Sequence, residues 1–248
     1  MGWSSYFDAL SGDSQLHPEQ AVHYVQSLAQ HVQLRKSDCV LDFGCGFGHV
    51  AQLLAPQVGQ VFFWDASSTM RLNATHRTAR LPNVRLCDLS GMPERRPQAH
   101  ERGAFDVILV NSVVQYITRD ATTAWLVRWR EMLAPGGTLV LSDLILPDQK
   151  GLSDLIDVVR IGRRLGSPLA ATWHAFGNPV RYWRTRHRAP LTCLDREELD
   201  RLAARAGLSV AVLPRNLTHF RTRWSAVLSQ VHPSETSPPD TPRPTSTS

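Results

Sequence analysis

Lysine, cysteine and long apolar runs are scarce in this chain, and each shortage excludes a class of protein. Two of the 27 basic residues are lysines, so the net charge of +5 rests on arginine, whose planar guanidinium pairs with carboxylates and phosphates through two hydrogen bonds. The four cysteines include no Cys-x-x-Cys pair, which argues against a zinc site or a disulfide framework. No apolar run approaches the roughly 20 residues that cross a bilayer, and no basic region followed by an apolar one begins the chain. We therefore expect a cytoplasmic protein without a membrane span.

The composition is that of one enzyme-sized domain with a polar tail. The chain has 248 residues, of which 42% are hydrophobic, and this is enough to build a substantial core. From Pro233 onward the sequence consists mainly of Ser, Thr and Pro, which bury too little apolar area to offset the entropy of ordering. We predict a single domain over residues 1–232 and a disordered tail over residues 233–248.

Residues 40–49 (Val-Leu-Asp-Phe-Gly-Cys-Gly-Phe-Gly-His) indicate a buried strand, a glycine-rich turn and the start of a helix. The three glycines leave backbone without Cβ where a ligand must approach closely, although a tight turn without a ligand would also use them. A dinucleotide-binding loop would need its third glycine at position 49, which is His49. The carboxylate of Asp42 at the mouth of the loop repels a pyrophosphate, but it suits a ligand that carries an ammonium group and a sulfonium.

A second apolar strand, over residues 60–65, ends in another acid, Asp65. A carboxylate at the end of the second strand of a Rossmann-like unit accepts hydrogen bonds from both ribose hydroxyls of a nucleoside. The alternative role of Asp65 is to cap a helix that begins at the following Ala-Ser-Ser run. Met70 comes shortly afterwards, and its soft side chain suits the face of a purine.

The glycine loop and these two acids resemble the corresponding motifs of class I S-adenosylmethionine-dependent methyltransferases. Three more segments continue the resemblance in order: residues 83–89 are similar to that family's third strand, 105–116 to its fourth strand and following loop, and 133–141 to the turn before its fifth strand. The resemblance implies an enzyme with S-adenosylmethionine as its cofactor. It also implies an α/β fold: a Rossmann-like, doubly wound, mostly parallel seven-stranded sheet with an antiparallel closing strand and an inserted helical lid.

The same resemblance implies which residues hold the cofactor, with Asp88 reaching the adenine amino group. They are Asp42, Gly44, Cys45, Gly46, Asp65, Ala66, Met70, Cys87, Asp88, Leu89, Asn111, Ser112 and Tyr116. Metal-dependent catechol-type enzymes need an acid at position 111 to hold magnesium, and an asparagine is a weaker ligand because it lacks the charge. Asp143 would restore such a site only in part, so we predict that no metal is needed.

Local patterns outside the five motifs predict the remaining elements. Residues 18–33 predict a leading helix with Val22, Val25, Leu28 and Val32 at helical spacing. Residues 195–198 (Asp-Arg-Glu-Glu) predict a capping box that opens a helix running to Gly207, and residues 208–213 and 223–228 predict a closing hairpin. We therefore divide the domain into an N-terminal helical cap (1–35), a cofactor-binding half (36–145), a lid or acceptor insertion (146–194) and a C-terminal helix and hairpin (195–232).

The insertion is strongly basic, because no acid lies between Asp157 and Asp195 whereas seven arginines do. One interpretation is a solvated arginine face beside a small aromatic core. The other is a lid that recognises an anionic acceptor or an acidic partner surface. For the second we predict that the acceptor contacts are Gln115, Trp173, Arg181, Tyr182 and Arg184.

Methyl transfer from a sulfonium is an in-line displacement in which positioning contributes about 7–11 kcal/mol. A hydroxyl acceptor also needs a base, and His174 and His187 are candidates because histidine titrates near neutral pH. The N-terminal segment is predicted to fold over the cofactor and to place Tyr6 near the methyl group. Surface histidines and a hydrophobic anchor for the first helix are the alternative roles for these three residues. A nitrogen acceptor with a free lone pair needs no base.

The loop at residues 111–116 is most similar to small-molecule methyltransferases and to the methylating domains of natural-product assembly lines. It has neither the Pro-Pro-aromatic run of base-amino methyltransferases nor the two glutamates of arginine methyltransferases. We expect methyl transfer to oxygen or nitrogen, rather than carbon, of a small anionic or carrier-bound acceptor in specialised metabolism. An acidic carrier protein is then the expected partner, and nucleic acid is disfavoured. The alternatives are an RNA- or protein-modifying methyltransferase that uses the basic insertion, and a non-catalytic cofactor-binding scaffold subunit.

Overall fold

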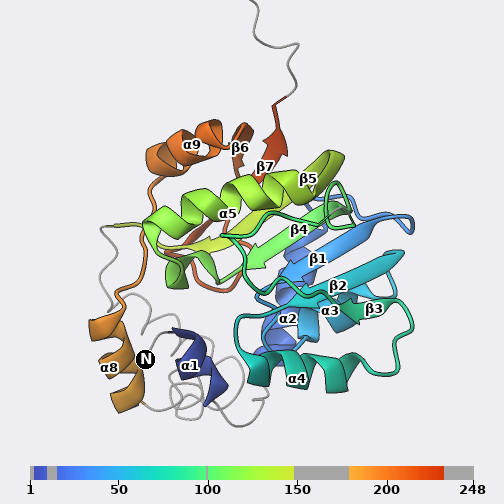
Figure 1. Cartoon of the computed structure of the whole chain (residues 1–248), viewed down its shortest axis with the longest axis horizontal. Helices are drawn as coiled ribbons and strands as arrows, with labels where there is room; N and C mark the ends of the chain where they lie inside the picture. Colours follow the sequence, from blue (N-terminus) through green and yellow to red (C-terminus); the bar gives the residue numbers. More distant parts are fainter. Residues whose placement is uncertain (1–2, 10–15, 99, 148–178, 232–248) are drawn as a thin grey trace, which may run out of the picture.

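A seven-stranded sheet runs through the middle of the protein (Figure 1). The computed structural model describes residues 3–9, 16–98, 100–147 and 179–231. The strand order is β3-β2-β1-β4-β5-β7-β6. The strands are β1 (Cys39–Phe43), β2 (Gln60–Trp64), β3 (Val84–Leu86), β4 (Phe105–Asn111), β5 (Leu133–Leu144), β6 (Leu208–Val212) and β7 (Trp224–Gln230).

Strands β1 to β5 pair in parallel, and β7 runs antiparallel to both of its neighbours, β5 and β6. The predicted doubly wound sheet with an antiparallel closing strand is therefore confirmed. Because β7 is reversed, it begins at the edge where the parallel strands end, and Trp224 pairs there with Leu144. The segment that joins β6 to β7 lies at that same carboxyl edge.

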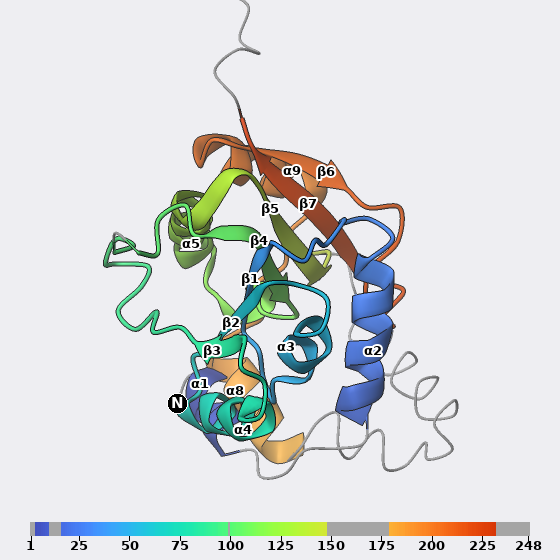
Figure 2. The same cartoon turned by 90° about the vertical axis from the view of Figure 1, so that its right-hand side faces the viewer.

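Two helical layers cover the sheet (Figure 2). One face packs against α2 (Leu16–Leu28), α3 (His49–Leu54) and α4 (Ser68–Thr78), and the other packs against α5 (Arg119–Met132) and α9 (Arg196–Arg205). Strand β4 shows why its sequence is an almost unbroken apolar run. Its Val107 and Leu109 enter the first core, whereas Ile108 and Val110 enter the second, so both faces of the strand are buried.

Three further elements lie past the carboxyl ends of the parallel strands. Helices α1 (Trp3–Asp8) and α8 (Pro179–Arg188) lie side by side there, next to the start of α4, and the 3-10 turn η1 (Val114–Tyr116) follows β4 (Figures 1 and 2). Most of the predicted insertion at 146–194 falls outside the described residues, and α8 belongs to the part that is described. Within the described ranges no helix has the length and apolar character that crossing a bilayer requires.

The leading helix differs from the prediction at its end. It stops at Leu28 rather than continuing to residue 33. The N–H groups of Gln30 and His31 bond to carbonyls three residues back, at Ser27 and Leu28, so the α-helical pattern is broken there. Val22, predicted on the buried face, is 41% exposed, and Ala21 and Tyr24 are buried instead. The helical spacing was correct for Val25 and Leu28, but the phase was shifted at the start of the helix.

The predicted cap of α9 is present. The Asp195 carboxylate accepts a hydrogen bond from the Glu198 N–H (2.7 Å), and Gly207 follows the helix with φ of +71°. The Glu198 side chain forms an ion pair with Arg119 at the start of α5 (2.9 Å). The cap therefore also joins α9 to the neighbouring helix.

Candidate active site

The glycine loop after β1 combines two packing glycines with one open position. A Cβ built on Gly44 would lie 2.2 Å from the Val113 side chain, and one on Gly48 would lie 2.9 Å from Ala74 of α4. A Cβ on Gly46 would meet no described atom within 4 Å. The first and third glycines are thus required by contacts within the protein, whereas the middle one leaves room for a ligand next to the backbone.

Asp65 joins this loop to the end of β2. One carboxylate oxygen accepts a hydrogen bond from the Gly46 N–H (3.0 Å) and the other from the Ser67 N–H (2.8 Å). The N-cap of α4 is Ser67, whose hydroxyl accepts from the Met70 N–H (3.2 Å), so the capping role considered for Asp65 belongs to another residue. Each oxygen of Asp65 keeps a second lone pair, which suits a pair of ligand hydroxyls.

Asp42 is a buried acid whose position favours a cationic ligand. It is 3% exposed, and burial together with the charge of Asp65 raises its pKa to about 7. A hydrogen bond from the Ala51 N–H lowers the pKa and offsets part of this rise. Its Oδ2 atom, like the Oδ1 atom of Asn111 at the end of β4, is buried without a hydrogen-bond donor in the described part of the chain. Buried acceptors are normally paired, so these two atoms point to donors that a ligand supplies.

These features fit S-adenosylmethionine. Its ammonium group supplies donors for buried acceptors, its ribose supplies the paired hydroxyls, and its chain can pass the open side of Gly46. The other predicted cofactor residues line the same loops: Cys45, Met70 and Leu89 are buried, Cys87 and Tyr116 are half-buried, and Ala66 and Asp88 are exposed. Burial raises the pKa of the Cys87 thiol to about 12, so this thiol is not a nucleophile at neutral pH.

Two strained residues stand at the ends of adjacent strands. Ser112 after β4 has φ of +57°, and Asp143 near the end of β5 has φ of +66°, a left-handed conformation that is uncommon outside glycine. The Ser112 hydroxyl donates to Asp143 Oδ2 (2.8 Å). Such strain is kept where the surrounding structure holds it, and it clusters at functional sites.

Asp143 is the centre of a buried polar cluster that the sequence did not reveal. It is 1% exposed and accepts from Arg223 Nη1 (2.7 Å), from the Thr218 hydroxyl (2.7 Å) and from the Asn216 amide (3.1 Å). These three partners come from the segment between β6 and β7, more than 70 residues away in the chain. A buried carboxylate needs such partners, because a buried charge without hydrogen bonds is costly.

Helix α1 packs across the carboxyl edge of the sheet. The Trp3 ring centroid lies 4.7 Å and the Phe7 centroid 5.2 Å from that of Tyr116, and Tyr6, which is 4% exposed, packs edge-on against Trp3. The Trp3 indole donates to the Ala189 carbonyl just after α8 (3.0 Å). At its other end Asp8 accepts hydrogen bonds from the Ser67 and Ser68 hydroxyls and from the Thr69 N–H, which lowers the Asp8 pKa.

The described members of the predicted acceptor and base set belong to α1, η1 and α8. Gln115 is buried, and its carbonyl accepts from the Thr192 N–H (2.9 Å). Arg184 and His187 are exposed on α8, and Arg181 and Tyr182 belong to the same helix, whereas Trp173 and His174 lie outside the described residues. In the described ranges no group of three or more His, Cys, Asp or Glu side chains is arranged to hold a metal ion.

Known proteins are similar to this chain in sequence and in fold. A family model described as a methyltransferase domain matches residues 41–139. An uncharacterized methyltransferase of Mycobacterium tuberculosis is 32% identical over 142 residues, which cover 57% of this chain and 68% of that protein. Chondramide synthase cmdD of Chondromyces crocatus is 30% identical over 145 residues, 58% of this chain and 4% of the synthase. The structure of the N-methyltransferase NodS from Bradyrhizobium japonicum in complex with S-adenosyl-L-homocysteine has a TM-score of 0.55 at 16% identity, and the match covers 92% of this chain and 96% of that one.

Proposed function

The chain belongs to the class I S-adenosylmethionine-dependent methyltransferases, and from this premise we propose that it methylates an oxygen or nitrogen of a small anionic or carrier-bound acceptor. The observation that supports an anionic acceptor is the composition of helix α8, which contains arginines and no acid. This helix lies beside α1, past the carboxyl edge of the sheet (Figures 1 and 2). Parallel α/β sheets bind ligands at this edge.

Each of the three acids would hold a different part of the cofactor. Asp65 would accept hydrogen bonds from the ribose hydroxyls, Asp42 would attract the ammonium group, and Asp88 would accept from the adenine amino group. When bound, the cofactor supplies an electrophilic methyl group on its sulfonium. The contribution of the protein is then to orient the acceptor and to keep water away, which is the role of the Trp3, Phe7 and Tyr116 rings across the edge.

A hydroxyl acceptor would pass its proton to a base, and His187 in the last turn of α8 is the described candidate. Tyr6, in the aromatic cluster of α1, would lie near the methyl group. An amine acceptor needs neither group, because it attacks through its lone pair. Gln115 is buried at the turn after β4, and its side-chain oxygen lies 3.5 Å from Arg223 Nη1. Its amide would hydrogen bond an acceptor at the same edge.

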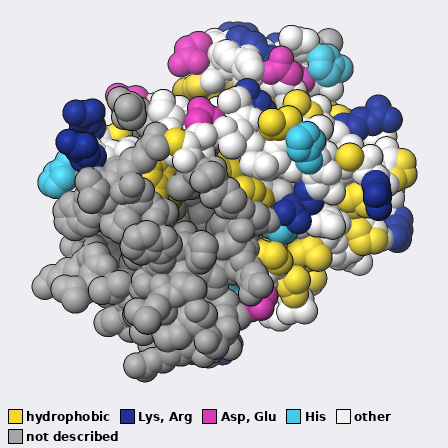
Figure 3. Space-filling view, turned by 90° about the horizontal axis from the view of Figure 1, so that it is seen from below, with side chains coloured by type: hydrophobic (Ala, Val, Ile, Leu, Met, Phe, Trp, Pro, Cys, Tyr) yellow, Lys and Arg dark blue, Asp and Glu magenta, His cyan; other side chains and the backbone are white. Residues whose placement is uncertain are grey.

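The charge on this side of the protein supports an anionic acceptor. Arg184 and Arg188 are exposed on α8, and the first turn of that helix holds no acid. In the view from below, Lys and Arg side chains stand out on both flanks of the described surface (Figure 3). The similarity to part of chondramide synthase, a much longer protein, supports the carrier-bound form of the acceptor.

The test is a screen followed by one charge-removing variant. The purified protein is incubated with methyl-labelled S-adenosylmethionine and metabolite pools separated by charge, and separately with loaded carrier proteins. For the acceptor found, we expect Arg181→Gln with Arg184→Gln to raise KM by about tenfold at low salt, where charge effects are least screened, with little change in cofactor affinity. The matched control is Arg196→Gln with Arg201→Gln, which removes the same amount of charge from two exposed positions of α9.

The same experiment separates the alternatives. A label found only in neutral acceptors, or a double variant with unchanged KM at low salt, would contradict an anionic acceptor. Label transferred to RNA, with affinity that falls steeply as salt rises, would favour a nucleic-acid-modifying enzyme. Cofactor binding without turnover on any pool or carrier would favour the scaffold role.

A further inference from the structure

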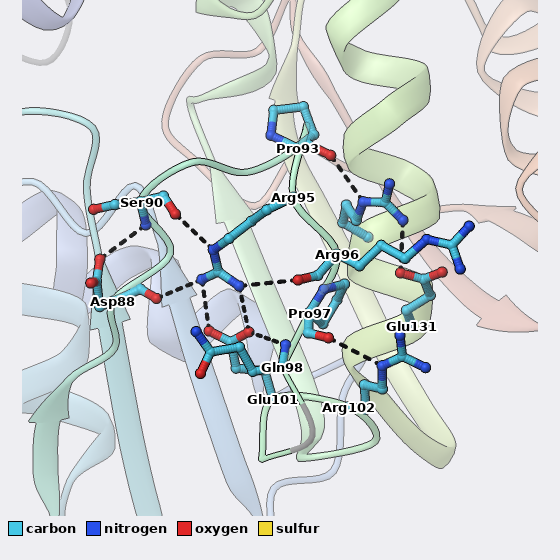
Figure 4. Close-up of polar contacts among 11 residues, drawn as sticks. Asp88, Ser90, Pro93, Arg95, Arg96, Pro97, Gln98, Glu101, Arg102 and Glu131 are labelled. Atoms are coloured by element: carbon cyan, nitrogen blue, oxygen red, sulfur yellow. Dashed lines mark hydrogen bonds and ion pairs between the residues drawn. The ribbon is translucent and has the colours of Figure 1, made fainter.

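One arginine organises the loop that carries Asp88. This loop runs from Cys87 to Ala104 between β3 and β4, and Figure 4 shows the Arg95 guanidinium at its centre. Arg95 Nε donates to the Ser90 carbonyl (2.7 Å), Nη2 to the Asp88 carbonyl (2.8 Å) and Nη1 to the Arg96 carbonyl (3.2 Å). The guanidinium thus binds backbone on both sides of Leu89, which is fully buried.

The two remaining N–H groups of Arg95 go to Glu101. Nη1 lies 2.8 Å from Oε2 and Nη2 lies 2.9 Å from Oε1, so the pair is bidentate, and Oε2 also accepts from the Gln98 N–H (2.6 Å). Glu101 is 2% exposed, and its hydrogen bonds with Arg95 lower its pKa. All five donors of the guanidinium are therefore used within one loop, a pattern that requires the planar fork of arginine.

Unlike the Arg95–Glu101 pair, the Asp88 side chain is exposed to solvent. Its Oδ1 atom accepts a hydrogen bond from the Ser90 N–H (3.0 Å). Hydrogen bonds from Ser90 lower its pKa, so the carboxylate is charged at neutral pH. Arg95 binds the backbone carbonyls of Asp88 and Ser90, and the Ser90 N–H binds the Asp88 carboxylate. The direction of the Asp88 side chain therefore depends on Arg95 through the backbone of Ser90.

We propose that the Arg95–Glu101 pair is a positioning device that aims the Asp88 carboxylate at the exocyclic amino group of adenine and so sets the base selectivity of the cofactor site. The inference rests on the proposed function, which assigns Asp88 to the adenine. A carboxylate held in one direction accepts from an amino group, but it repels the oxygen that hypoxanthine carries at the same position. A carboxylate on a loosened loop would discriminate less between the two bases.

The test compares two ligands by calorimetry, S-adenosylhomocysteine and its hypoxanthine analogue S-inosylhomocysteine. Wild type should bind the adenine compound more tightly. Arg95→Lys keeps the charge but loses the fork, and we expect it to weaken binding of the adenine compound about tenfold, as for a lost hydrogen bond to a charged group, with a smaller effect on the analogue. The matched control is Arg102→Lys, because Arg102 donates to the Pro97 carbonyl of the same loop (3.1 Å) and should leave the ratio of the two Kd values unchanged.

A thermal unfolding scan shows whether each variant is folded. If Arg95→Lys does not fold, Glu101→Asp is used instead, because it shortens the partner of Arg95 and retains its charge. It should reduce the ratio of the two Kd values in the same way. In an Asp88→Asn background the ratio should already be small, and Arg95→Lys should change it no further. An unchanged ratio in Arg95→Lys, or equal weakening of both ligands, would overturn the positioning role. Failure of wild type to bind S-adenosylhomocysteine would instead overturn the proposed function.

Discussion

Asp42 shows how a single residue links folding to ligand binding. Its folded-state pKa of about 7 exceeds the ordinary 3.8, so between these values the folded protein holds a proton that the unfolded chain has lost. The free energy of unfolding without ligand should therefore fall as pH rises from 3.8 to about 7. A ligand ammonium group instead favours the deprotonated form of Asp42, because it is attracted by the charged carboxylate.

We predict that affinity for S-adenosylhomocysteine rises as pH increases through about 7 and that binding releases a proton below that pH. Calorimetry in buffers of different ionisation enthalpy measures both quantities. Asp42→Asn should remove the pH dependence and the proton release. Affinity that is flat with pH in wild type would show that Asp42 does not face the ammonium group.

At the scale of single residues, the sequence identified candidate site residues where an acidic side chain stands at the spacing of the family motif. Asp42 lies near the end of β1, and Asp65 and Asp88 follow β2 and β3, at the positions that the family motif requires. The ends of these three parallel strands meet at one edge of the sheet. Arg95 and Glu101 were missed, because one guanidinium bound to three carbonyls leaves no mark in local sequence. The chain also has 25 arginines, so arginine content alone singles out none of them.

At the scale of elements, the Asp143 cluster joins three segments that local sequence treats separately. It connects the end of β5 to the turn after β4 through Ser112, and to the β6–β7 segment through Arg223. Helix starts and strands could be predicted from periodicity and capping residues. The contact between Asp143 and Arg223 could not, because it depends on the reversed strand bringing distant residues to one edge.

We predict that Asp143→Ala lowers the free energy of unfolding by about 3–5 kcal/mol, since it leaves the buried Arg223 charge without its carboxylate. Denaturant unfolding measures this. Asp143→Asn should cost less, because asparagine tolerates the left-handed conformation and keeps hydrogen-bonding capacity. Asp200→Ala, at an exposed position of α9, is the control and should change stability by at most about 0.5 kcal/mol. A loss no larger than that of the control would mean that the cluster does not stabilise the edge.

At the scale of the whole molecule, the cofactor-binding half and the elements that cover its carboxyl edge come from different parts of the sequence. The strands and loops that hold the three acids lie within residues 39–111, whereas the covering parts come from α1, α8 and the β6–β7 segment. The contiguous half is therefore the part whose fold the sequence predicted well. The acceptor side is assembled from distant segments, and its specificity could be predicted only as a charge preference.

We predict that turnover does not depend on a metal ion. Asp143, the acid nearest to Asn111 in strand register, is engaged by Arg223, and an ion pair of this kind competes with metal coordination. Turnover with the acceptor found by the screen should be unchanged after exhaustive treatment with a chelator. Activity that vanishes and returns with magnesium would require Asn111 and Asp143 to be ligands.

The reversed direction of β7 has a consequence for how such an enzyme can diversify. Because β7 starts at the carboxyl edge, the segment over residues 213–223 reaches the site while remaining outside the parallel half of the sheet. Insertions, deletions or recombination in that segment would alter the surroundings of Asp143 and leave the glycine loop and the three acids intact. Natural variation among related enzymes should therefore accumulate at the positions of this segment that do not bind Asp143, while Asn216, Thr218 and Arg223 keep the edge stable. Descendants would then acquire new acceptors while they inherit one cofactor.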